Sequence, residues 1–181
     1  MVNELNATFK KVILLSVLTT LMGVGIVYVL SRSFNSPSPP LKPPTTAEKV
    51  DAQVGLKLAM TLQKAEYGLN EPINLTFAIT NISNQTMNYT YSNPNFEFWV
   101  YNDTNNEVYS WSRSQIFPCY VFNMPLKPGE SLTEVLTWPQ TCNKTFLSEG
   151  IPVSPGTYYI VGKNPMYRLQ TTPIQVTITK P

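Results

Sequence analysis

The stretch INLTFAITN, residues 73–81, has a large apolar residue at every second position. Strict alternation of this kind predicts a β-strand with one face in a core and the other in water. VGLKLAMTLQ, residues 54–63, repeats the period. The inward positions of the two stretches are Val54, Leu56, Leu58, Met60 and Leu62, and Ile73, Leu75, Phe77 and Ile79.

The rest of the chain continues this pattern. Phe96, Phe98 and Val100 form a third inward set, and turn-forming Asn, Asp, Pro and Gly separate the later apolar runs. Those runs cover residues 108–111, 116–122, 132–138, 158–162 and 174–178. No long amphipathic helix and no repeat of solenoid length is visible, so the sequence predicts one all-β domain, an antiparallel β-sandwich over residues 50–181.

Composition narrows the function. The chain has 13 basic and 11 acidic residues and a net charge of +2, which is too weak a field to grip a phosphate backbone, so nucleic acid is not an expected partner. Histidine, the commonest general base and metal ligand, is absent, and two cysteines cannot build a zinc cage. We therefore expect a protein that is not an enzyme and that uses no cofactor or metal.

The N-terminal part contains the uncharged run VILLSVLTTLMGVGIVYVL, residues 12–30. At about 1.5 Å per residue it nearly crosses a bilayer core, which predicts a single transmembrane helix; a cleaved signal peptide is the alternative. Lys10 and Lys11 on one side favour a cytoplasmic segment over residues 1–11. Residues 31–49 are expected to be a proline-rich stalk, with the sandwich outside the cell membrane.

An exported location would favour two covalent modifications. Cys119 and Cys142 are expected to form a disulfide, with a free thiol pair as the alternative. Asn-X-Ser/Thr sequences predict glycosylation, although composition alone would generate some of them. The acceptor positions are Asn74, Asn81, Asn84, Asn88, Asn102 and Asn143.

Four segments taken in order carry a family resemblance: YGLNEPINLTFAITNISNQT, FEFWVYNDTNNEVYSWS, LKPGESLTEVLTW and VSPGTYYIVGK. Between about Tyr67 and Gly162 the chain resembles the BsuPI-type intracellular proteinase inhibitor family. The resemblance implies an immunoglobulin-like β-sandwich in which Phe96, Phe98, Val108 and Trp111 fill the core. It also implies proteinase inhibition, for which residues 111–117 would be the exposed loop.

Aromatic residues suggest a binding surface. Trp99, Tyr101 and Tyr109 are expected on strand faces opposite the core, together with Tyr89 and Tyr91, where rings suit an interface. An oxygen-rich loop is the candidate for calcium, with a plain hairpin turn as the alternative. Its residues are Asn102, Asp103, Asn105 and Glu107. A pair of carboxylates of the kind a glycosidase needs is the least favoured alternative.

These observations support three hypotheses. The first is a membrane-anchored cell-surface module that binds a partner protein through a sandwich face or its loops. The second is a proteinase inhibitor of the BsuPI type, and the third is a subunit of a surface filament that self-assembles.

Overall fold

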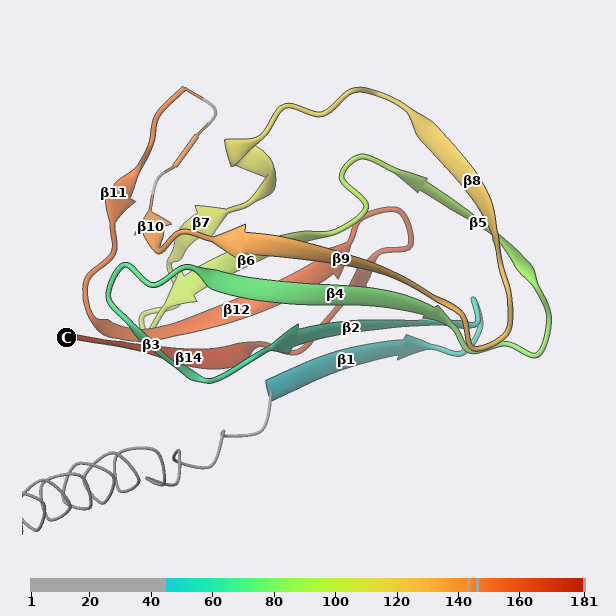
Figure 1. Ribbon diagram of the computed structural model, residues 1–181, viewed down its shortest axis with the longest axis horizontal. Coiled ribbons are helices and arrows are strands. Elements are labelled where there is room, and N and C mark those ends of the chain that lie inside the picture. Colours follow the sequence, from blue (N-terminus) through green and yellow to red (C-terminus); the bar gives the residue numbers. More distant parts are fainter. Residues whose placement is uncertain (1–44, 143, 146, 181) are drawn as a thin grey trace, which may run out of the picture. The chain divides into compact units, whose positions relative to one another are not determined.

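The computed structural model describes residues 45–142, 144–145 and 147–180. One β-sheet has the strand order β1-β2-β4-β9, in which every neighbour pairs antiparallel. Its strands are β1 (Thr45–Asp51), β2 (Leu56–Leu62), β4 (Ile73–Asn81) and β9 (Ser131–Trp138). The two alternating stretches, residues 54–63 and 73–81, therefore form the central pair of this sheet, β2 and β4 (Figure 1).

The second sheet has the order β3-β14-β12-β6-β7, with β13 paired to β12. Its strands are β3 (Glu66–Gly68), β14 (Ile174–Thr179), β12 (Gly156–Asn164), β6 (Glu97–Asn102), β7 (Glu107–Ser110) and β13 (Leu169–Gln170). The order β2-β4-β9 opposite β14-β12-β6 is that of an immunoglobulin-type sandwich. One expectation needs correction, because β3 lies parallel to β14 rather than antiparallel. Residues 63–65 carry the chain from β2 to this edge of the second sheet.

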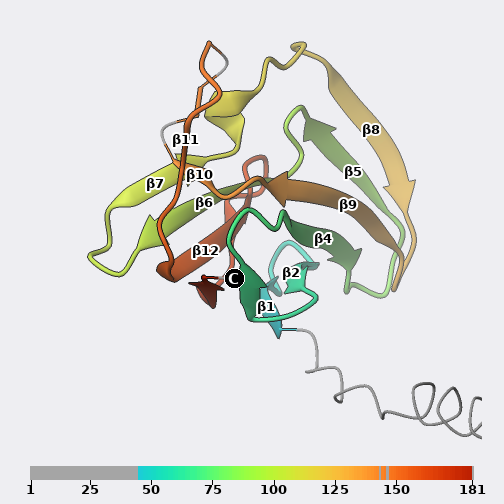
Figure 2. The ribbon, with the colours of Figure 1, turned by 60° about the vertical axis from the view of Figure 1, so that its left-hand side comes forward.

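Two small two-stranded sheets stand apart from these larger sheets. β5 (Met87–Ser92) pairs with β8 (Val121–Leu126), and β10 (Thr141–Cys142) pairs with β11 (Ile151–Pro152). Figures 1 and 2 show β5 and β8 at one end of the fold and β10 and β11 at the other. A short 3-10 helix, η1 (Ser112–Ser114), follows β7.

The fold class predicted from the sequence is corrected in its helical part. The expected transmembrane helix over residues 12–30 lies outside the described residues, as do residues 1–11 and 31–44. Among the described residues no helix is long and apolar enough to cross a membrane, and a span needs about 20 apolar helical residues. The part of the chain that the structure describes is thus an all-β sandwich without such a helix. Residues 45–49, expected in the stalk, belong to β1.

Alternation correctly predicted the core. All the expected inward positions of β2, β4 and β6 are fully buried, including Phe77 and Val100, and so is Phe96 directly before β6. Phe77 stacks on Phe96 with ring centroids 5.3 Å apart. Val54 is the exception and is exposed, because it lies in the turn before β2, where its backbone N–H donates to the Asp51 carboxylate.

The two sheets approach closely at Gly162, a glycine of β12. A Cβ atom on Gly162 would lie 2.6 Å from Cε1 of Phe77 and 2.9 Å from Sδ of Met60. Both neighbours come from the first sheet, from β4 and β2. Only a residue without a side chain leaves room for them, so this position sets the spacing of the core.

A buried polar cluster attaches the β5–β8 strand pair to the second sheet. The Tyr89 hydroxyl donates to Oδ1 of Asn95 at 2.7 Å, and Nδ2 of Asn164 donates to the Tyr89 hydroxyl at 3.0 Å and to the Asn95 backbone oxygen at 2.8 Å. All three residues are buried. Burial also raises the pKa of Tyr89. Such satisfied networks fix geometry, because a buried polar atom without its partner is costly.

Replacing Gly162 with alanine is expected to lower the free energy of unfolding by about 1–3 kcal/mol, because the new methyl group overpacks the core. Gly156→Ala, in the same strand, is the control, since its Cβ would meet Cε2 of Tyr158 at an ordinary 3.9 Å. That control should stay within about 0.5 kcal/mol of the parent. Urea unfolding measures both variants, and equal stabilities would contradict the close approach of the sheets.

Tyr89→Phe is expected to cost about 1–3 kcal/mol, because Oδ1 of Asn95 loses a donor in a buried place. Tyr91→Phe is the matched control in the same strand, since the Tyr91 hydroxyl has no hydrogen-bond partner within the described part of the chain. Chemical unfolding gives both energies, and hydrogen exchange should show faster opening of β5 and β8 for Tyr89→Phe alone. Similar losses for the two variants would refute the role of this network.

Candidate functional site

An exposed apolar segment joins η1 to β8 across one side of the fold (Figure 1). We call residues 115–122, QIFPCYVF, the apolar arch. Ile116, Tyr120 and Val121 are 66%, 63% and 64% exposed. Scattered single apolar residues on a surface are ordinary, whereas a contiguous group marks an interaction site.

Aromatic and hydroxyl contacts anchor the first end of the arch. The Phe117 ring lies 5.4 Å from that of Trp111, measured between ring centroids. Oγ of Ser114 donates to the Trp111 backbone oxygen at 2.7 Å and is 3.2 Å from the Tyr109 hydroxyl. Tyr109 is buried in the core, where its ring stacks on Phe98. The arch thus leaves the sandwich from a fixed point.

A stack of rings anchors the second end. Phe122 of β8 lies opposite Tyr91 of β5, and their ring centroids are 5.1 Å apart. Tyr91 stacks on Tyr89 at 5.7 Å, and Tyr89 on Tyr167 at 5.2 Å. Since Tyr89 belongs to the buried polar cluster, the exposed end of the arch is connected to the core through consecutive ring contacts.

The arch offers apolar contact and no ionic chemistry. Its eight residues include no charged side chain. The neighbouring cation, Arg113, forms an ion pair with Glu107 instead. A surface of this type gains affinity by removing apolar and aromatic side chains from water, as protein interfaces do at their centres.

Of the three residues predicted for the aromatic surface, two lie on an outer strand face, and their role in an interface stays a prediction. Trp99 and Tyr101 lie on the outer face of β6, half-buried, opposite Val161 and Tyr159 of β12. Burial first, and the nearby Glu107 carboxylate second, raise the pKa of Tyr101.

Tyr109 was wrongly placed on that surface, because a register irregularity between Val100 and Tyr101 pairs it with the inward Val100. Of the two supporting tyrosines, Tyr89 is fully buried and Tyr91 is half-buried.

The oxygen-rich loop after β6 is held by its own hydrogen bonds. Oδ1 of Asn102 accepts from Oγ1 of Thr104 and from the backbone N–H of Asn106, both at 2.8 Å. Residue Asn105 has a positive φ of 60°, which suits a tight turn. Among the described residues no group of three or more His, Cys, Asp or Glu could hold a metal ion. This geometry is that of the hairpin turn.

The cysteines are free in the structure. Cys119 is exposed in the arch, and Cys142, in β10, is half-buried against the core. Their pairing stays a prediction.

The acceptor asparagines divide by burial. Asn74, Asn84 and Asn88 are exposed and Asn102 is half-buried, whereas Asn143 lies outside the described residues. Asn81 is fully buried, and its Nδ2 donates to the backbone oxygens of Gln85 and Leu126. Because these bonds use its amide hydrogens inside the fold, glycosylation of Asn81 is excluded. The other acceptors stay predictions.

The sequence prediction is wrong for most of the arch. The apolar run of residues 116–122 predicts a strand of the sandwich, yet β8 begins only at Val121. Pro118 inside the run, and the lack of alternation, were the signals against a core strand.

Comparison with solved structures finds distant likeness. A β-glucosidase from Listeria innocua in complex with glucose is 15% identical, with 68% of this chain and 16% of that chain covered and a TM-score of 0.40. The CARDB domain of a Pyrococcus furiosus protein is 12% identical, with 79% of this chain and 100% of that chain covered and a TM-score of 0.36. The chain therefore spans only a small part of the β-glucosidase. No curated protein sequence matches this chain.

The comparison with protein families is more specific. Residues 60–167 match the family described as BsuPI, intracellular proteinase inhibitor. The match runs from β2 through β12 and contains the whole apolar arch. The family is one of inhibitor domains and not of catalysts. The chain belongs to the BsuPI intracellular proteinase inhibitor family.

Proposed function

We propose that this chain is a non-enzymatic protein-binding module whose apolar arch docks on a partner protein. The single observation that carries the proposal is that the arch exposes large apolar side chains while both its ends are held by ring contacts. A free flexible loop would lose much of its binding energy in becoming ordered, and a pre-organised one avoids that loss.

A proteinase is the partner class that we favour. Membership of the inhibitor family supports it, and so does the form of the arch, an exposed segment held at both ends. Ile116, Phe117 and Tyr120 are apolar or aromatic, which suits a serine proteinase with a hydrophobic specificity pocket. A proteinase whose specificity pocket requires a Lys or Arg side chain would find neither within the arch.

The proposal predicts that the full chain inhibits a serine proteinase of chymotrypsin-like or subtilisin-like specificity more strongly than trypsin. Ile116→Ser and Tyr120→Ser are expected to weaken inhibition about 30-fold each, as for a residue worth about 2 kcal/mol at an interface. Steady-state inhibition constants measured with a small chromogenic substrate give the comparison.

Val135→Ser is the control, because Val135 is a 57% exposed apolar residue of β9. That strand pairs with β4 and contributes no residue to the arch. The Val135→Ser variant should inhibit like the parent. Sedimentation of the same variants separates a further possibility, contact between copies of the chain. If the chain self-associates through the arch but inhibits no proteinase, the proteinase is rejected as the partner and the protein-binding role is kept.

A further inference from the structure

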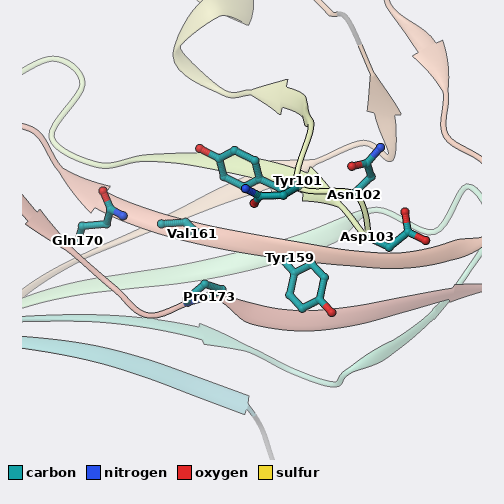
Figure 3. Close-up of a pocket in the computed structure, with 8 residues that line it drawn as sticks. Tyr101, Asn102, Asp103, Tyr159, Val161, Gln170 and Pro173 are labelled. Atoms are coloured by element: carbon teal, nitrogen blue, oxygen red, sulfur yellow. The ribbon is translucent and has the colours of Figure 1, made fainter.

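A surface hollow lies on the outer face of the second sheet, and none of its lining residues belongs to the arch (Figure 3). It has a volume of about 510 Å³, within the usual range for small-molecule sites, and is open to solvent. Residues from β6 and the turn after it, from β12, from β13 and from the segment between β13 and β14 line it. They are Tyr101, Asn102, Asp103, Asn105, Tyr159, Val161, Gln170 and Pro173.

Strand register assembles the apolar part of the hollow. Tyr101 of β6 lies directly opposite Tyr159 of β12, and Trp99 lies opposite Val161. Side chains directly opposite on one face of a sheet have Cβ atoms about 4.5–5.5 Å apart. The two tyrosines therefore share one face of the sheet with the buried Val161, while their rings point away from each other (Figure 3).

Polar groups surround these rings. The hydroxyls of Tyr101 and Tyr159, the Asp103 carboxylate and the Gln170 amide have no hydrogen-bond partner elsewhere in residues 45–142, 144–145 and 147–180. Asn102 directs its amide oxygen to its own turn, which leaves its Nδ2 group as a donor. The hollow thus combines ring faces with donors and acceptors that are open to a ligand.

The lining excludes two ligand classes. It contains no Lys or Arg, so nothing in it would balance a phosphate or carboxylate. Lys163, on the same strand face, lies over the Trp99 ring at 4.9 Å and forms an ion pair with Glu97 instead. An added peptide strand is excluded as well, because β6 and β12 each have paired strands on both sides and no free backbone edge.

We propose that this hollow binds a neutral carbohydrate. A pyranose ring has an apolar C–H face, which packs against the electron-rich face of a tyrosine ring, and a rim of hydroxyls that both donate and accept. Tyr101 and Tyr159 would stack on sugar rings, while Asp103, Asn102 and Gln170 would bind their hydroxyls. Sugar hydroxyls suit the hollow because the side-chain amides of Asn102 and Gln170 also both donate and accept hydrogen bonds. The site is independent of the proposed role of the arch.

The test is calorimetric titration of the full chain with neutral hexasaccharides: cellohexaose, maltohexaose and chitohexaose. At least one should bind with a dissociation constant below about 1 mM, which corresponds to about −4.1 kcal/mol. Tyr101→Ala and Tyr159→Ala should each weaken that binding at least 10-fold, whereas Tyr159→Phe, which keeps the ring, should change it less than 3-fold. Unchanged thermal unfolding midpoints would show that the variants remain folded.

Tyr120→Ser, in the arch, is the control and should leave carbohydrate binding unchanged; it also separates this proposal from the proteinase role. Failure of all three hexasaccharides to bind would overturn the proposal. So would tighter binding of a sulfated heparin hexasaccharide, or binding that survives both alanine variants. Choline is the rival probe, because two tyrosines beside a carboxylate also suit a quaternary ammonium group. Binding of choline in place of sugars would likewise overturn it.

Discussion

The close packing of the two sheets at Gly162 is the constraint on which the rest of the structure depends. Phe77 and Met60 occupy the space in which any other side chain at that position would stand. Each fully buried large apolar side chain contributes about 1.5–3 kcal/mol relative to its exposed state, and β2 and β4 supply alternate buried residues along their whole lengths. The remaining elements are attached to a core that this contact brings together.

Attachment of the β5–β8 strand pair determines the position of the exposed arch. This strand pair belongs to neither large sheet, and its position relies on the hydrogen bonds among Tyr89, Asn95 and Asn164. The rings of Tyr89, Tyr91 and Phe122 then extend from that cluster to the exposed arch. A stable core thereby supports an apolar surface that would otherwise have no fixed shape, which is the property that an inhibitor loop requires.

The two proposed surfaces use different parts of one fold. The arch is a connection between η1 and β8, where chain geometry is set by its anchors. The hollow proposed for carbohydrate is on the face of β6 and β12, where strand register places Tyr101 opposite Tyr159. Because the two surfaces share no residue, a change in one need not alter the other, and a partner protein and a glycan could be bound together.

The sequence by itself determined the strand periods, and with them the buried faces of β2, β4 and β6, because a side chain's direction in a strand alternates strictly. It also indicated the immunoglobulin-like inhibitor family and the outward position of Trp99 and Tyr101. Only the tertiary structure decided the burial of Tyr109, the parallel pairing of β3 and the exposure of most of residues 116–122. These depend on a register irregularity and on which sheet the chain joins next, and local periodicity contains none of that information.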